Sequence, residues 1–167
     1  VLGLPGLPYP QGSDFASIIG WKDLSKQIEQ VEDEIENATQ IEPLLVGMDK
    51  YNIASELAFY RTKQSVEKGN AKEGVLYTTG RHLFGMESLM YRYWFQKGLQ
   101  DKGFDKDLTL ILVTRELHEL MNDRISSSGW VIGDVKELKV KKNGIPVGKY
   151  YYALAKRYQD TRLKGSN

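Results

Sequence analysis

Leu108-Thr109-Leu110-Ile111-Leu112-Val113 is the stretch that decides the fold class. Six uncharged, mostly aliphatic residues in a row are typical of a strand that is buried on both faces of a sheet. Residues 43–48 (PLLVGM) form a shorter run of the same kind, bounded by turn residues. Strands of this kind occur mainly in parallel sheets that are covered by helices, so the two runs predict an α/β domain.

Segments with helical spacing surround these runs. The clearest is 21–38, in which apolar residues recur at steps of three and four. We expect its buried face to consist of Trp21, Leu24, Ile28, Val31, Ile35 and Ala38. The opposite face, in contact with solvent, is expected to carry Glu29, Glu32, Asp33, Glu34 and Glu36.

Further elements follow the first apolar run. Asp49 or Asn52 can cap a helix that buries Ile53, Ala54, Leu57 and Ala58. Residues 63–73 are polar and predict an exposed loop, whereas 74–79 predict a second strand. A short helix is expected over 86–95. Another helix, at about 115–127, is expected to bury Leu117, Leu120, Met121 and Ile125.

The C-terminal part of the chain changes to the period of two that marks strands. Residues 135–141 and 147–155 flank Asn143-Gly144, a strong signal for a two-residue hairpin turn. Such a turn is expected to place Val140 opposite Val147. The order of the expected helices and strands along the chain predicts a three-layer α/β sandwich with a mostly parallel central sheet and an antiparallel C-terminal hairpin at its edge.

Length and composition fit one globular domain. Of the 167 residues, 41% are hydrophobic and 27% are charged, which excludes disorder as the main state. The net charge of +1 gives no general attraction to nucleic acid, so we expect no nucleic-acid partner. We assign 14–167 to a single α/β domain. The glycine- and proline-rich residues 1–13 are expected to be a linker from a preceding region.

Several kinds of catalytic site have no support in the sequence. Without cysteine there is no disulfide, thiol nucleophile or cysteine-bound zinc, and the common phosphate-loop, dinucleotide and nucleophile-elbow patterns do not occur. His118-Glu119 resembles the first half of a zinc-protease helix, but Asn122 stands where the second histidine should be. An exposed pair on a helix explains it better. We predict no catalytic residue, no metal and no cofactor.

The loop after the second expected strand is the first candidate binding site. Thr78, Thr79, Arg81 and His82 lie at the junction of that strand and the loop. Loops at strand ends hold ligands in α/β folds, and arginine suits phosphate. The alternative is a structural loop, in which Arg81 pairs with a carboxylate and His82 satisfies a buried backbone group.

Two neighbouring stretches add candidates. Asp49, Lys50 and Tyr51 follow the first strand, another position favoured for ligand sites. A helix cap with surface charges explains them equally well. Arg92 lies inside an aromatic cluster, which is either a platform for sugar stacking or, more often at helical spacing, part of the core.

Basic residues concentrate near the C-terminus. Lys136, Lys139, Lys141 and Lys142 are candidates for contact with anionic lipid head groups. Lysines also commonly protect exposed edge strands, and this explanation is equally good.

Two long stretches carry a family resemblance. Residues 44–60 (LLVGMDKYNIASELAFY) and 80–95 (GRHLFGMESLMYRYWF) resemble the C-terminal tail of bacterial membrane glycosyltransferases of the dolichyl-phosphate-mannose protein mannosyltransferase and aminoarabinose transferase type. Residues 20–24 and 149–155 are also similar to that tail. The likeness covers most of the chain.

The resemblance implies an accessory role. The parent would be a multi-spanning enzyme that moves a sugar from a polyprenyl-phosphate donor to an acceptor. The family's catalytic acidic residue lies between early membrane helices, so the resemblance assigns no catalytic residue to this chain. The implied partners are the membrane-embedded region of the same polypeptide, lipid-linked sugar phosphate and anionic lipid head groups. The implied location is the periplasmic face of the bacterial inner membrane, for a domain that is itself soluble.

A different function stays open. The chain can also be a free-standing α/β domain or enzyme that binds a phosphosugar or nucleotide at residues 78–82. A pure interaction module is a third possibility.

Overall fold

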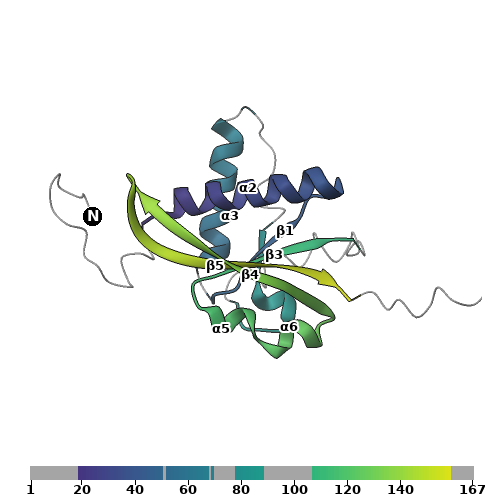
Figure 1. Ribbon diagram of the computed structural model, residues 1–167. Helices are drawn as coiled ribbons and strands as arrows, with labels where there is room; N and C mark the ends of the chain where they lie inside the picture. Colours follow the sequence, from purple (N-terminus) through teal and green to yellow (C-terminus); the bar gives the residue numbers. More distant parts are fainter. Residues whose placement is uncertain (1–18, 51, 68, 70–77, 89–106, 159–167) are drawn as a thin grey trace, which may run out of the picture.

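The computed structural model describes residues 19–50, 52–67, 69, 78–88 and 107–158. They form one five-stranded mixed sheet with helices packed against it (Figure 1). The strands are β1 (Leu44–Gly47), β2 (Thr78–Gly80), β3 (Thr109–Thr114), β4 (Trp130–Lys142) and β5 (Ile145–Arg157), in the order β2-β1-β3-β5-β4. The predicted α/β class is confirmed. The finer description as a three-layer sandwich stays a prediction.

The sheet combines parallel and antiparallel pairing. β1 lies between β2 and β3 and is parallel to both. β5 is antiparallel to β3 on one side and to β4 on the other. The sheet is therefore mixed rather than mostly parallel, with β4 at its edge.

Alternate residues of the central strands fill two separate cores, as the period of a strand requires. From β3, Ile111 and Val113 join the core under α2 (Trp21–Thr39) and α3 (Ile53–Glu67). Leu110 and Leu112 join a second core with side chains from the elements on the other side, among them Phe84, Leu120 and Ile125. We call the two sides the α2 face and the α6 face.

The predicted first helix is confirmed as α2, with two exceptions among its predicted faces. Leu24, Ile28 and Ile35 are buried as expected, whereas Ala38 is exposed. Glu32, expected on the solvent face, is only 6% exposed. The guanidinium of Arg61, on the neighbouring helix α3, lies 2.9 Å from the Glu32 carboxylate, so the buried acid has a basic partner.

The helix after β1 is also confirmed. α3 buries the four predicted residues Ile53, Ala54, Leu57 and Ala58. The loop predicted over 63–73 begins too early, because α3 continues to Glu67. The polar side chains at the end of α3 stop its packing against the core. The helix itself continues, since a helix can extend into water. Residues 68 and 70–73 lie outside the described part of the chain.

The second strand and the element after it are shorter than predicted. β2 covers Thr78–Gly80, and residues 74–77 of the predicted strand lie outside the described ranges. A single 3-10 turn, η1 (Arg81–Phe84), follows. Residues 86–88 of the predicted helix are not helical, and 89–95 lie outside the described ranges.

The helix predicted at 115–127 is in fact two short helices, α5 (Leu117–Leu120) and α6 (Asp123–Ser127). The break occurs at Asn122, whose side chain caps α6 by accepting a hydrogen bond from the Arg124 backbone N–H. Leu120 and Ile125 are buried as predicted. Leu117 and Met121 are 40% and 68% exposed, because the break turns them away from the core.

The C-terminal hairpin has the predicted turn but a different register. Asn143 and Gly144 both have positive φ, as a type I′ turn requires. Val140 pairs with Gly148 rather than with Val147, because the register shifts between Val140 and Lys141. Tyr151 of β5 pairs with Thr114, the last residue of β3. Residues 145–150, which precede Tyr151, lie beside β4 alone. The hairpin thus extends past the end at which β1, β2 and β3 finish, and we call this end the carboxyl end of the sheet (Figure 1).

Within the described ranges, no helix is long and apolar enough to cross a bilayer.

Candidate functional site

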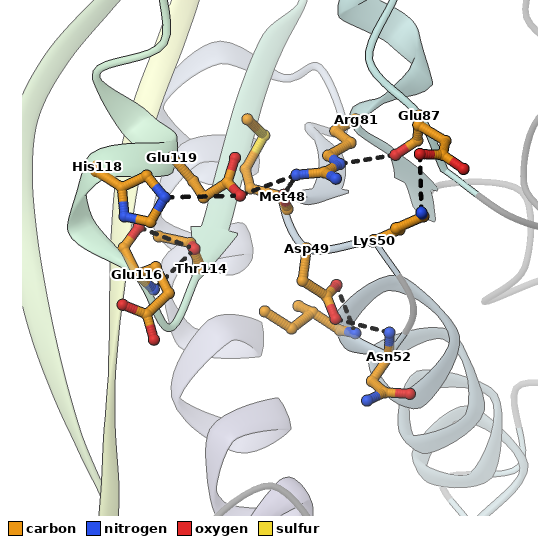
Figure 2. A network of polar contacts seen from close by, with 11 residues as sticks. Met48, Asp49, Lys50, Asn52, Arg81, Glu87, Thr114, Glu116, His118 and Glu119 are labelled. Carbon is orange, nitrogen blue, oxygen red and sulfur yellow. Dashed lines mark hydrogen bonds and ion pairs between the residues drawn. The ribbon is translucent and has the colours of Figure 1, made fainter. Parts of the chain in front are cut away.

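The topology marks one place in the sheet as suited to ligand binding. β1 and β3 are parallel neighbours. β1 leads into α3 on the α2 face, whereas β3 leads into α5 and α6 on the opposite side. In open α/β sheets, ligands bind where two adjacent connections leave toward opposite faces, beyond the carboxyl ends of the strands. Polar residues gather at this place (Figure 2).

Arg81 is the centre of this group. Its Nη1 donates to Glu119 Oε1 at 2.9 Å and to the Met48 carbonyl at 3.3 Å. Its Nε donates to the Glu87 carbonyl at 2.8 Å. The Arg81 and Glu119 side chains are only 15% and 20% exposed. Figure 2 shows Arg81 connecting segments that follow β1, β2 and β3, so the guanidinium is engaged by the protein itself.

Asp49 and Lys50 are engaged as well. The Asp49 carboxylate accepts from the backbone N–H groups of Asn52, at 2.7 Å, and Ile53, at 2.9 Å, which caps the start of α3. Lys50 Nζ lies 2.8 Å from Glu87 Oε2. The Glu87 side chain is 69% exposed, so this ion pair contributes little to stability.

The remaining candidates of the loop are distributed differently. Thr78 begins β2 and accepts from Arg61 Nη1 at 3.3 Å, at the end of the sheet remote from Arg81. Thr79 is fully buried within β2. His82 is half-buried in η1, next to Arg81 in the chain. Tyr51 and Arg92 lie outside the described residues.

Sequence reasoning missed Glu119 as a site residue. Glu119 was interpreted only as part of a failed zinc motif, and its role as the partner of Arg81 depends on a contact between residues 38 positions apart. His118 Nε2 lies 3.9 Å from Glu119 Oε1, but the His118 side chain is 76% exposed. The described residues contain no group of histidine and acidic side chains that could hold a metal ion.

The turn that follows β3 lies next to the polar group around Arg81 (Figure 2). Thr114 Oγ1 accepts from the Glu116 backbone N–H at 3.0 Å, which fixes the turn into α5. The Arg115 guanidinium lies 5.7 Å from the ring centre of Tyr150. Burial raises the pKa of Tyr150 to about 12, against the opposing effect of Arg115. The Tyr150 phenol therefore stays protonated at neutral pH and cannot act as a general base there.

The lysines predicted to meet a membrane lie on both sides of the hairpin. Lys136 is on the α2 face, with its Nζ 5.8 Å from the ring centre of Tyr152. Lys139 lies on the opposite face, since its neighbours Leu138 and Val140 pack under α2. Lys141 is exposed and Lys142 is half-buried, both next to the turn.

No protein-family model, no curated protein and no solved structure matches this chain. The assignment of function therefore depends on the described contacts and on the resemblance carried by residues 44–60 and 80–95.

Proposed function

We propose that this chain is an accessory domain of a bacterial membrane glycosyltransferase, of the type that its sequence resembles, and that it contributes no complete catalytic site. In this proposal the membrane-embedded region of the same polypeptide transfers a sugar from a polyprenyl-phosphate donor. The domain lies at the periplasmic face of the inner membrane and presents the carboxyl end of its sheet to that region and to the bilayer.

The observation that carries the proposal is the gathering of three features at one end of the domain. The polar group around Arg81 lies at the carboxyl end of the sheet. The lysine-bearing hairpin extends beyond the same end. The start of α2 is there too, since Gly20 packs against Val140 and Val147 of the hairpin. A domain that is tethered just before α2 would therefore turn its polar group and its lysines toward the tether.

The resembling stretches meet at this end. The first supplies β1, the Asp49 cap and the start of α3, and the second supplies Arg81 and Glu87. They are joined by the bond from Arg81 to the Met48 carbonyl and by the ion pair of Lys50 with Glu87. Because Arg81 joins the segments that follow β1, β2 and β3 and Asp49 caps α3, the contacts support a role in positioning rather than in catalysis.

Photo-crosslinking in native membranes tests this placement. A crosslinking amino acid at Glu116, which is exposed at the carboxyl end, is expected to give adducts with lipid or with the membrane-embedded region of the whole encoded protein. Val66 is the matched control. It is 61% exposed and follows Arg61, which contacts Glu42 and Thr78 at the opposite end of the sheet.

The two positions separate the possible results. Adducts from position 116 with none from position 66 support the proposal. Adducts from position 66 alone, or recovery of the whole protein from the aqueous fraction, contradict it.

The switch-point position of Arg81 specifically favours the alternative, a domain that binds phosphosugars or nucleotides by itself. A rise in the Tm of the isolated chain with such ligands, lost in Arg81→Ala, would favour that alternative over the accessory role.

A further inference from the structure

We propose that the β4–β5 hairpin inserts its turn into the interface of a bilayer with anionic head groups, so that Ile145 enters the apolar boundary and the flanking lysines bind lipid phosphates. This inference rests on the proposed placement of the domain at a membrane, and it names the element and the residues that make the contact.

The turn of the hairpin combines exposed apolar surface with a border of positive charge. Residues 143–147 carry no charge, while five lysines and one glutamate lie between 136 and 150. Ile145 is 51% exposed and Pro146 is exposed beside it. Interfacial membrane elements have this composition, with apolar side chains at the acyl boundary and lysines at the head groups.

The hairpin is held rigidly in its extended position. The Lys141 backbone N–H donates to Asp23 Oδ2 at 2.8 Å, and Gln27 Nε2 donates to the Lys139 carbonyl at 3.2 Å. On the α2 face, Val140 and Tyr150 are buried against the start of α2, where the Tyr150 ring lies 5.6 Å from that of Trp21. The turn thus projects without having to become ordered on binding, which favours affinity.

One cross-strand pair points to an anionic partner. Lys139 and Lys149 face each other directly in the antiparallel ladder. Like charges in this arrangement are destabilising, and Glu137, 3.6 Å from Lys149, is the acidic neighbour that offsets them in part. Protection of an edge strand does not need a second lysine opposite the first. A negatively charged surface gives both ammonium groups a counter-charge.

Vesicle binding by the purified chain tests the inference. Wild type is expected to bind vesicles that contain phosphatidylglycerol and to bind pure phosphatidylcholine much more weakly. Lys139→Gln/Lys149→Gln is expected to lower the affinity for the anionic vesicles about 30-fold at low salt, since each lysine near the surface contributes. The same double variant should not lose thermal stability, because it relieves a like-charge pair. The matched control, Lys63→Gln/Lys156→Gln, removes the same charge from α3 and from the other end of β5, where Lys156 pairs with Thr109, and should lower affinity less than threefold.

Insertion of the turn has its own readout. The chain has no cysteine, so Ile145→Cys can carry a single environment-sensitive fluorophore. Its emission is expected to shift to the blue on anionic vesicles, while the same label at Val66→Cys should not respond. Equal affinities of the two double variants, or an unchanged emission from position 145, would overturn the inference. Because the assay uses lipid alone, a negative result would leave the accessory role open, whereas a failed transferase assay would leave vesicle binding intact.

Discussion

Gly47→Ala is expected to lower the free energy of unfolding by about 3 kcal/mol, a large fraction of the stability of a domain this size. A Cβ atom at Gly47 would lie 2.4 Å from the Ala54 backbone nitrogen and 2.8 Å from the Ala54 Cβ. Neither atom belongs to a flexible side chain, so the end of β1 and the start of α3 would have to separate. Urea unfolding followed by circular dichroism measures the effect.

Gly133→Ala is the matched control for this substitution. Gly133 lies in β4, and its nearest neighbour to an added Cβ is the Leu154 carbonyl oxygen at 3.4 Å, an ordinary contact. We expect a change within about 0.5 kcal/mol. Similar unfolding midpoints for the two alanine variants would show that the close approach of β1 and α3 does not determine the stability of this region.

The contribution of Glu32 to the stability of the wild-type chain is expected to fall as the pH rises from about 4.5 to 7. Burial raises the pKa of Glu32 from its ordinary value of 4.5 to about 7, although the neighbouring Arg61 opposes this. Charges that face Glu32 are Arg61 of α3, Glu42 before β1, and Glu29 and Asp33 of α2. Between the two pKa values the folded state keeps a proton that the unfolded state has lost, so stability declines with pH there.

The difference between the two pKa values corresponds to a contribution of about 3 kcal/mol to the free energy of unfolding. This contribution is present in full below pH 4.5 and is lost above pH 7. Other groups also titrate, so the informative quantity is the difference in unfolding free energy between wild type and Glu32→Gln at each pH. Relative to Glu32→Gln, wild type should lose about 3 kcal/mol of unfolding free energy between pH 4.5 and 8. Glu36→Gln, on the exposed side of the same helix, should show no such trend. A difference that is independent of pH would contradict the account.

Local patterns sufficed for much of the fold. The apolar spacing of α2, the four buried residues of α3 and the continuous apolar run of β3 were predicted correctly, because each depends on one face being buried. The turn at Asn143-Gly144 was also correct, since positive φ strongly selects these residues. The hairpin register was wrong by one residue, because the shift next to Val140 leaves no mark in the sequence pattern.

Long-range pairing limited the prediction of the site. The burial of Glu32 depends on Arg61, and the engagement of Arg81 depends on Glu119; neither pair is close in the sequence. For Asp49, the observed helix cap was one of the two roles expected from the sequence. For Arg81, the observed carboxylate partner was likewise one of the two expected roles. The division of the lysines between two faces was not foreseen, since strand alternation assigns faces only once the buried side is known.

Sugar transfer from a polyprenyl-phosphate-linked donor tests the central claim most directly, in membranes that carry the whole encoded protein and, in parallel, with the purified 167-residue chain. We expect transfer by the whole protein, its loss when residues 19–158 are deleted, and no turnover by the purified chain at any donor concentration. Turnover by the chain alone, or full transfer by the protein without these residues, would contradict the assignment of an accessory domain.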